Sequence, residues 1–377
     1  MKILKSGATP SAIVALSQKI TRMSRERNVE FLRLERGIPG VRPIDLQSAL
    51  PFIPFNAPQL QAYPPSTGRE DLKTAVNASY FAGQTRSERI IVTPGGSMGL
   101  DIAFQILDVD KVFLPEFHWG TYRKILQIRN RSWDYYASLD EFTVRPERFT
   151  GSAVVICDPD NPLGSLQPAG RVIDTAANLG AAGAAVLVDC PYRRLFLDPS
   201  DGFYEALARL ENVVIVESFS KSLGLSGLRV GFVHASDPDF LSEFSLRLAL
   251  PTNGVDNIAQ AFIEHFLARP EGRAAAETYR TATAEHTAKN LAFLETRGLL
   301  AAEFYREAKC LGIFAIINRT PEELLESRIG AISLAAFTET RKDQTAGYAR
   351  INIAVPHDAF VAFFEAHMKR FPSGSAG

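Results

Sequence analysis

Short apolar runs alternate with segments of helical periodicity between residues 89 and 235, and this alternation limits the fold more than any other feature. The runs are rich in Val and Ile, which is typical of buried strands. Expected strands are 89–93, 111–114, 153–157, 184–189, 213–217 and 230–235, and expected helices are 69–82, 97–107, 122–128 and 168–179. Because strands separated by helices usually pair in parallel, we predict an α/β protein with a mainly parallel sheet.

The pattern changes after residue 237, where longer helical segments replace the alternation. Expected helices are 240–248, 255–267 and 272–295, followed by a strand, a helix and a strand at 312–318, 321–327 and 348–354. The helix at 272–295 is long enough to join two domains. This change indicates a second, smaller α/β unit near the C-terminus.

The first forty residues do not follow the central alternation either, and residues 35–43 read as a Gly- and Pro-rich loop. We expect this segment to pack with the C-terminal unit. The predicted division is a large domain at 45–265 and a small discontinuous domain formed by 1–44 and 266–377.

Charge and cysteine content exclude several classes of function. With 41 lysines and arginines against 42 aspartates and glutamates, there is no electrostatic basis for a nucleic-acid or membrane partner. Cys157, Cys190 and Cys310 lie far apart, and the histidines lack metal-ligand spacing, so we expect neither disulfides nor a metal. No apolar run approaches the ~18 residues of a membrane span, and no signal peptide is evident, so we expect a cytoplasmic protein.

The segment that carries the clearest chemical signal is 216–232, where an expected strand ends among hydroxyl groups, glycines and a lysine. Ser218, Ser220 and Lys221 follow the strand, and Arg229 comes next in the segment. A lysine that is partly removed from water can form a Schiff base. Hydroxyls and an arginine suit a phosphate. Taken alone, the segment fits a solvated Ser- and Gly-rich loop equally well.

Three further polar turns follow expected strands. Residues 95–97 open a helix and would offer free backbone N–H groups to an anion. Asn161 and Asp189 follow or end two other strands. Each turn also has a purely structural explanation, such as a capped helix or a turn asparagine. Ligands of open parallel sheets bind outside the carboxyl ends of the strands, so we expect these groups and Lys221 to share one cleft.

On these residues the sequence resembles the class I and II aminotransferases, which are pyridoxal-phosphate (PLP) enzymes of fold type I. The resemblance runs from about residue 34 to about residue 355. Its most specific segments are Ser218-x-Ser-Lys-x-x-Gly-Leu-x-Gly-x-Arg-x-Gly231, Asn161-Pro-x-Gly164 and Asp189-x-x-Tyr192. Weaker matches are Tyr63-x4-Gly68-x3-Leu72-Lys73, Trp119-Gly-Thr-Tyr122, Gly37-Ile-Pro39 and Tyr348-Ala-Arg-Ile-Asn352.

The resemblance implies PLP as cofactor and a role for each motif. Lys221 would form the Schiff base and move the proton at the substrate Cα. Asp189 would pair with the pyridinium nitrogen, and Tyr192 would bond the 3′ oxygen; these three are the expected catalytic residues. The other expected contacts to the cofactor are Gly95, Gly96, Ser97, Trp119, Asn161, Ser218, Ser220 and Arg229.

The resemblance also implies the substrate contacts and the assembly. Arg350 and Gly37 would bind the substrate α-carboxylate, since a planar guanidinium matches a carboxylate bidentately. Tyr63 would reach the phosphate of the neighbouring subunit, which implies a homodimer.

Two assignments around the cofactor ring stay open in the sequence. Phe117 competes with Trp119 for the position stacked on the ring, because it lies two residues after the strand-ending Pro115. Tyr122 is expected close to Asp189.

The leading function is amino transfer between an amino acid and a 2-oxo acid by a ping-pong mechanism. A β-eliminating lyase or an amino-acid decarboxylase would use the same cofactor residues. A non-catalytic PLP-binding module is a third candidate, which the presence of Lys221, Asp189, Tyr192 and Arg350 opposes.

Side-chain specificity is open as well. A dicarboxylic substrate needs a second cation, for which Arg36, Arg42, Arg69 and Arg193 are candidates. The aromatic group of Phe117, Trp119 and Tyr122 also makes an aromatic or apolar substrate conceivable. For Arg193 and Arg194 we expect a solvated or interface position.

Overall fold

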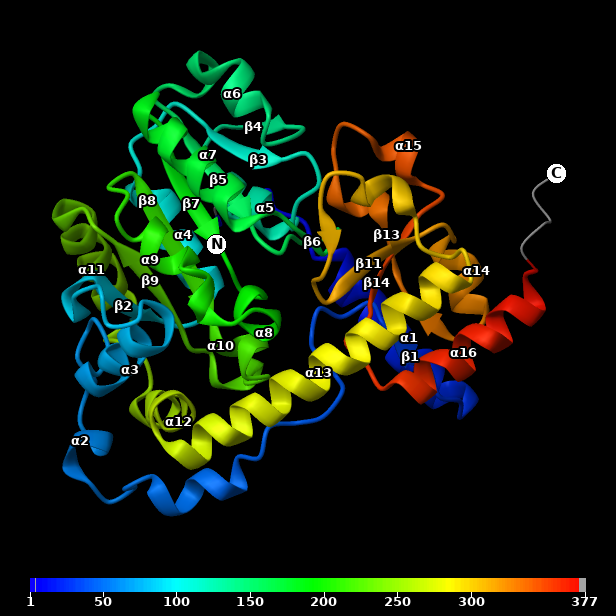
Figure 1. Ribbon diagram of the computed structural model, residues 1–377, viewed down its shortest axis with the longest axis horizontal. Coiled ribbons are helices and arrows are strands. Elements are labelled where there is room, and N and C mark those ends of the chain that lie inside the picture. Colours follow the sequence, from blue (N-terminus) through cyan, green and yellow to red (C-terminus); the bar gives the residue numbers. More distant parts are fainter. Residues whose placement is uncertain (4, 373–377) are drawn as a thin grey trace.

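The large part of the chain is organised around a seven-stranded sheet (Figure 1). The computed structural model describes residues 1–3 and 5–372. The strands run in the order β2 (Ile90–Thr93), β9 (Gly231–Ala235), β8 (Val213–Ser218), β7 (Ala185–Asp189), β5 (Ala153–Cys157), β3 (Val112–Pro115) and β4 (Trp133–Tyr136). Neighbours pair in parallel from β8 to β4, whereas β9 is antiparallel to both β2 and β8. The predicted α/β fold with a mainly parallel sheet is confirmed.

Helices cover both faces of this sheet, and alternate residues of a strand face different clusters. Val213 and Ile215 of β8 pack on the face that carries α3 (Glu70–Tyr80), α7 (Ala169–Ala181) and α12 (Asn257–Ala268). Val214 and Val216 pack on the opposite face, with α4 (Gly96–Ile106), α5 (Thr121–Ile128) and α11 (Pro238–Thr252). Because each strand is apolar on both faces, the central strands appear in the sequence as continuous hydrophobic runs.

Strand β4 was not predicted, and its position explains why. It is the edge strand beside β3, and its sequence Trp-Asp-Tyr-Tyr is mostly half-buried. A strand that meets water along one edge does not need a continuous apolar run.

A smaller antiparallel sheet lies beyond the long helix α13 (Pro270–Thr296), which runs diagonally across Figure 1 from α12 to α16 (His357–Arg370). Its strands are β11 (Phe314–Ile317), β14 (Ala349–Asn352) and β13 (Ile332–Ser333), in that order. Leu294 of α13 and Phe360 and Phe364 of α16 cover this sheet with a core of its own. The boundaries 45–265 and 1–44 with 266–377 stay a prediction.

The N-terminal segment lies against the C-terminal unit, as expected. Strand β1 (Leu32–Arg33) pairs in parallel with β12 (Ile329–Gly330), and Figure 1 shows the blue N-terminal elements beside the orange and red ones. It also contains a helix that was not predicted, α1 (Ala12–Arg27). Ile13, Leu16 and Ile20 pack inward from this helix, and their spacing of three and four residues is the signal that could have found it.

The remaining elements are short. They are α2 (Pro58–Gln61), α6 (Glu141–Val144), α8 (Arg193–Phe196), α9 (Phe203–Leu207), α10 (Phe219–Ser222), α14 (Pro321–Glu326), α15 (Lys342–Thr345), β6 (Ser165–Leu166) and β10 (Lys309–Cys310). Short 3-10 helices occur at Gln47–Phe52, Ser87–Arg89, Pro146–Phe149, Pro199–Asp201, Ser226–Leu228, Ala302–Tyr305 and Leu334–Phe337. Among the described residues, none of the helices combines the length and hydropathy that a membrane span requires.

Candidate active site

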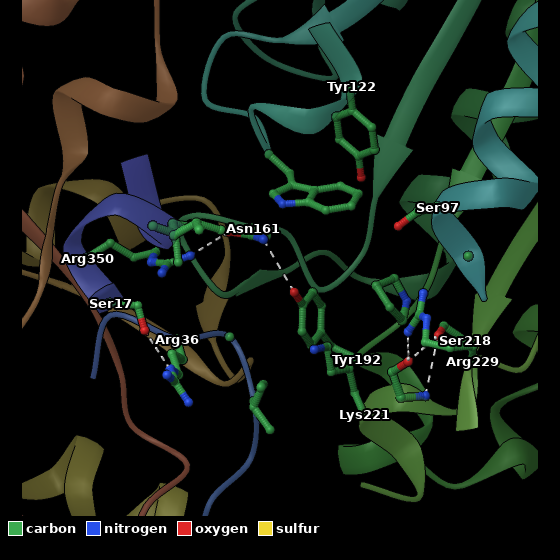
Figure 2. A pocket seen from close by; sticks show the side chains of 18 of the residues that line it. Ser17, Arg36, Ser97, Tyr122, Asn161, Tyr192, Ser218, Lys221, Arg229 and Arg350 are labelled. Carbon is green, nitrogen blue, oxygen red and sulfur yellow. Dashed lines mark hydrogen bonds between the residues drawn. The ribbon is translucent and has the colours of Figure 1, made fainter. Parts of the chain in front are cut away.

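A cavity of about 870 Å³ lies at the carboxyl ends of β5, β7 and β8. Helix α1, residues 36–38 and Arg350 complete its wall from the side of the smaller unit. The predicted site residues that line it are Gly37, Gly96, Ser97, Trp119, Asn161, Asp189, Tyr192, Ser218, Ser220, Lys221, Arg229 and Arg350. In Figure 2, Lys221, Ser218 and Arg229 lie on one side, and Arg350, Ser17 and Arg36 on the other. Segments that are far apart in the sequence therefore meet in one cavity.

Lys221 lies in α10, the single helical turn that follows β8. Its backbone carbonyl accepts a hydrogen bond from the Tyr279 hydroxyl at 3.2 Å. Within the described part of the chain, the ammonium group has neither a hydrogen bond nor an ion pair. Burial lowers the pKa of this lysine to about 8, with smaller contributions from Arg229 and Arg350. A lysine with a lowered pKa has more of the neutral, nucleophilic amine at neutral pH.

Asp189 ends β7 and is almost completely buried. One carboxylate oxygen accepts a hydrogen bond from the Tyr122 hydroxyl, so Tyr122 lies next to Asp189 as expected. Burial raises the pKa of Asp189 to about 7, and no ion pair with this carboxylate occurs among the described residues. A buried carboxylate without a cation can bind a protonated ring nitrogen, and that partner would return its pKa towards the usual range.

An anion cradle is formed where α4, β8 and the segment after α10 meet. The Ser218 hydroxyl donates to Ser220 Oγ at 3.0 Å, and Arg229 Nη1 donates to Ser220 Oγ at 3.4 Å. Gly96 and Ser97 begin α4, whose first turn has no side-chain cap. A free helix N-terminus, two hydroxyls and a guanidinium form a donor set that fits a phosphate.

Gly95 does not line the cavity, and the geometry shows a different reason for glycine at this position. Its φ is +82°, in the region that favours glycine. A Cβ there would lie 2.5 Å from Arg229 Nη2. Glycine therefore allows the guanidinium to reach the start of α4.

Arg350 connects the smaller unit to the cavity. Its Nη1 donates to Asn161 Oδ1 at 3.2 Å, and its Nη2 donates to the carbonyl of Glu35 at 2.6 Å. Asn161 Nδ2 in turn donates to the Tyr192 hydroxyl at 3.3 Å. Burial lowers the pKa of Arg350 to about 10, and its buried Nε has no partner among the described residues. The guanidinium is thus fixed in place and keeps a free donor for a carboxylate.

Two aromatic rings and a glycine support this arginine. Its guanidinium carbon lies 4.2 Å from the centre of the Phe314 ring and 4.7 Å from that of Phe337. A Cβ on Gly37 would lie 2.8 Å from Phe314 Cζ. A side chain at position 37 would therefore displace the ring on which Arg350 rests.

The structure distinguishes the two aromatic candidates for the cofactor ring. Trp119 lines the cavity and packs edge-on against Tyr122, with ring centres 5.5 Å apart. Phe117 packs instead against Phe304, at 5.8 Å, and under the guanidinium of Arg341. Only Trp119 of the two faces the cavity, which favours it as the stacking residue.

Tyr63 lies outside the cavity of its own chain. Its side chain is 87% exposed, in the segment after α2. The predicted contact with a phosphate therefore requires a second subunit.

The expectation for Arg193 was wrong. This arginine is buried, forms ion pairs with Asp158 and Asp201, and lies 3.6 Å from the centre of the Phe203 ring. It is neither solvated nor a second cation of the cavity, because two carboxylates in the core already hold it. The residues next to Arg193 in the sequence are Tyr192 and Arg194, and neither indicates that two aspartates from other segments bind it.

Of the other cation candidates, one lines the cavity. Arg69 forms an ion pair with Asp71, and Arg42 borders a different depression beside Ala282 and His286. Arg36 lies in the cavity wall beside Ser17 of α1.

The residues that the sequence reasoning missed are those of α1. Its cavity-lining residues are Ile13, Val14, Ser17, Gln18, Thr21, Arg22, Arg25 and Glu26. Polar residues at 17, 18, 21, 22 and 25 alternate with the apolar positions 13, 16 and 20, as in an amphipathic helix. The periodicity identifies the helix, whereas its position over the cavity depends on contacts that are distant in sequence.

Residues 55–358 match the family described as "Aminotransferase class I and II". Among curated proteins, the chain is 27% identical over 226 residues to an aspartate aminotransferase of Bacillus subtilis, covering 52% of this chain and 54% of that protein. It is 26% identical over 202 residues to a threonine-phosphate decarboxylase of a Sinorhizobium species, covering 53% and 56%. The chain thus spans about half the length of the curated relatives it matches.

Among solved structures, the chain is similar to an aspartate aminotransferase from Thermus thermophilus determined with maleate. The TM-score is 0.81 at 22% identity, and the match covers 98% of this chain and 100% of that one. At this identity, the similarity establishes the fold.

Proposed function

The chain belongs to the class I and II aminotransferases, and from this membership we propose that it transfers an amino group between an amino acid and a 2-oxo acid by a ping-pong mechanism. Members of this family are PLP enzymes, which confirms the predicted family, enzyme class and cofactor. The observation that carries the proposal is the position of Lys221, which lines a cavity together with Asp189, an anion cradle and Arg350, and whose amine has no partner among the described residues.

We assign Lys221 as the covalent anchor of the cofactor and as the group that moves the proton at the substrate Cα. When bound, PLP supplies an electrophilic aldehyde and a ring that accepts the electron pair released at that carbon. A pKa of about 8 keeps a fraction of the lysine neutral at pH 7, so the amine can accept a proton and later return it.

Asp189 and Tyr192 would orient the ring. One oxygen of Asp189 is held by Tyr122, which leaves the other for the protonated ring nitrogen. Burial raises the pKa of Tyr192, so its hydroxyl stays protonated and acts as a hydrogen-bond donor. Asn161, which bonds to Tyr192, would share the ring oxygen with it. Trp119 would stack on the ring face.

The anion cradle would hold the phosphate, and Arg350 would hold the substrate. Hydroxyls of Ser218 and Ser220, the guanidinium of Arg229 and the first N–H groups of α4 can donate to the phosphate oxygens. The Nε of Arg350 and the backbone beside Gly37 would bind the α-carboxylate. Fixed anchors at both ends would hold the Cα at the Lys221 amine.

The assembly and the compartment are part of the proposal. We propose a homodimer in which Tyr63 binds the phosphate in the partner subunit, and a cytoplasmic location. The exposure of Tyr63 on a single chain supports the shared site. Sedimentation of the purified protein measures its assembly.

A decarboxylase is the second candidate, because one relative is named threonine-phosphate decarboxylase. A single turnover separates the two functions. Holoenzyme mixed with a donor amino acid alone should release one equivalent of the 2-oxo acid per site and retain the amino group on the cofactor. Release of CO2 or ammonia with an unchanged cofactor would reject amino transfer.

A further inference from the structure

We propose that the substrate carries a second anionic group, remote from its α-carboxylate, and that Arg36 and the arginines of α1 bind it. The inference deepens the proposed amino transfer, on which it rests, by assigning a class of substrate. It starts from the charges that remain in the cavity wall after the cofactor and the α-carboxylate have been given their partners.

Arg36 is held by one end and free at the other. Its Nε donates to Ser17 Oγ at 2.8 Å, and its side chain is 49% exposed. Among the described residues, its two terminal nitrogens have no hydrogen-bond partner. Figure 2 shows Arg36 beside Ser17, on the same side of the cavity as Arg350. A guanidinium in this state can bind a carboxylate or a phosphate bidentately.

The nearest carboxylate does not satisfy Arg36. Glu35 Oε1 lies 3.7 Å from Arg36 Nε, but the same oxygen accepts hydrogen bonds from Arg33 Nε at 2.8 Å and from the Ser17 hydroxyl at 3.2 Å. Arg33 also donates to Ser17 Oγ at 2.7 Å. Two arginines share one buried carboxylate, and Arg33 has the better geometry. Glu35 therefore neutralises Arg36 only in part, and the positive charge of Arg36 can attract an anion in the cavity.

Helix α1 adds further cations on the same wall. Gln18, Arg22 and Arg25 follow one another by four and three residues, so they share one face of the helix, and all three line the cavity. Arg22 forms an exposed ion pair with Glu26 at 4.0 Å. Within the described chain, Arg25 has no ion pair. The α1 side of the cavity thus holds three arginines and a single carboxylate, Glu26.

The other charged groups of the cavity already have partners under the proposed function. Lys221 and Arg229 serve the cofactor, Arg350 serves the α-carboxylate, and Asp189 serves the ring. The excess of positive charge on the α1 side has none. A wall with uncompensated cations attracts an anion, and the rigid fork of Arg36 fixes the position of that anion.

Helix α1 is held in place over the cavity. Gln127 Nε2 of α5 donates to the carbonyl of Gly7 at 3.0 Å, and Lys124 Nζ of the same helix donates to that of Pro10 at 3.1 Å. Within the helix, Ser17 is bonded to Arg33 and Glu35. The cationic wall is therefore connected both to α5 and to the loop that leads to Gly37.

The test compares donors of similar size that differ in charge. For the holoenzyme, we expect kcat/KM to be higher for aspartate, glutamate or O-phosphoserine than for asparagine, glutamine or serine. In R36Q, we expect the ratio of anionic to neutral donors to fall by about 10- to 100-fold, the scale of losing a hydrogen-bonded charge pair. Comparing kcat/KM for aspartate with kcat/KM for O-phosphoserine then shows whether the preferred anion is a carboxylate or a phosphate.

Arg27→Gln is the matched control, because Arg27 belongs to α1 but does not line the cavity. This variant should keep the wild-type ratio. Arg25→Gln, an exposed change that does not threaten folding, should lower the ratio by a smaller factor than R36Q. Calorimetric titration with succinate and with butyrate should show the same preference without turnover.

An unchanged ratio in R36Q, which means equal losses for anionic and neutral donors, would overturn the proposed binding of a second anionic group by Arg36. A wild-type preference for neutral donors would do the same. In each of these cases, 2-oxo acid formed from any donor in a single turnover would still support the proposed amino transfer. Absence of amino transfer from every donor would overturn the proposed function itself.

Discussion

The two walls of the cavity differ in how far apart their residues lie in the sequence. The wall that we propose binds the cofactor, the cofactor side, consists of short turns at the ends of β7 and β8 and at the start of α4. The wall that we propose binds the substrate, the substrate side, consists of α1, Arg36 and Arg350, which come from opposite ends of the chain. The comparison teaches that a sheet edge positions local motifs by itself, whereas the second wall exists only once the two chain ends have packed against each other.

The largest effect should follow a change at the centre of the cofactor side. Lys221→Ala removes the amine that we propose anchors the cofactor and moves the proton. We expect kcat to fall by at least about 10³-fold, while circular dichroism and thermal unfolding remain close to wild type. Borohydride treatment should link the cofactor to wild type and not to the variant. Multiple turnover by the variant would contradict this role for Lys221.

Asp189→Asn should give the next largest loss. It keeps the shape of the side chain but removes the charge that we propose pairs with the ring nitrogen. We therefore expect kcat to fall by roughly 10²- to 10³-fold, the scale of losing a preorganised electrostatic partner. Tyr122→Phe, which removes only the hydroxyl that holds Asp189, is the milder comparison. Steady-state kinetics on both variants, with bound cofactor measured by absorbance, checks the order.

The raised pKa of Asp189 also predicts how the stability of the cofactor-free protein depends on pH. Burial raises the pKa of Asp189 from 3.8 to about 7, so between these values the folded protein binds more protons than the unfolded chain. Stability from this group is therefore present at low pH and is lost as pH rises towards 7, by at most about 1.4 kcal/mol per pH unit. Urea unfolding at pH 4.5 to 7.5 should show a steeper decrease in wild type than in Asp189→Asn. A smaller decrease should remain in the variant, because burial also raises the pKa values of Asp158, Asp160 and Glu217. Parallel curves would contradict the assignment.

A pair of arginine substitutions separates the two walls. Arg350→Lys should lower kcat/KM by about 10- to 100-fold through weaker donor binding, because lysine cannot reproduce the planar contact, and should retain cofactor affinity. Arg229→Lys should do the opposite and weaken PLP binding first. Donor titrations and cofactor titrations on both variants measure the split. Equal loss of cofactor affinity in Arg350→Lys would place Arg350 on the cofactor side.

The elements that could be predicted from the sequence differ from those that could not in a similar way. The helix expected at 122–128 is α5 at Thr121–Ile128, whose buried residues Tyr122 and Leu126 lie four positions apart. The strand expected at 153–157 is β5, a short, fully buried run rich in Val and Ile. The edge strand β4 and the helix α1 were missed, since half-exposed elements mix polar and apolar residues.

The candidate site shows the same limit. Residues such as Asp189 and Lys221 could be identified because their turns must follow particular strands. The sequence did not show that Arg193 is bound by Asp158 and Asp201, or that Arg36 lines the cavity. Which arginines are free and which are neutralised depends on tertiary neighbours, and no local pattern encodes them.

The smallest effect tests how precisely the substrate wall is positioned. Ser17→Ala removes the hydroxyl that accepts from Arg36 Nε at 2.8 Å, and leaves the charge of Arg36 in place. A hydrogen bond to a charged group contributes about 1.5–3 kcal/mol, but water can replace Ser17 at the half-exposed Arg36. We therefore expect the ratio of kcat/KM for aspartate over asparagine to fall by only about 2- to 10-fold. Ser24→Ala is the matched control, since Ser24 lies on the same helix, does not line the cavity and donates its hydroxyl to the carbonyl of Val29 beyond the helix end. An equal loss in both variants would mean that α1 merely needs to be folded, whereas a loss confined to Ser17→Ala would show that Arg36 must be held in one orientation for the substrate wall to discriminate charge.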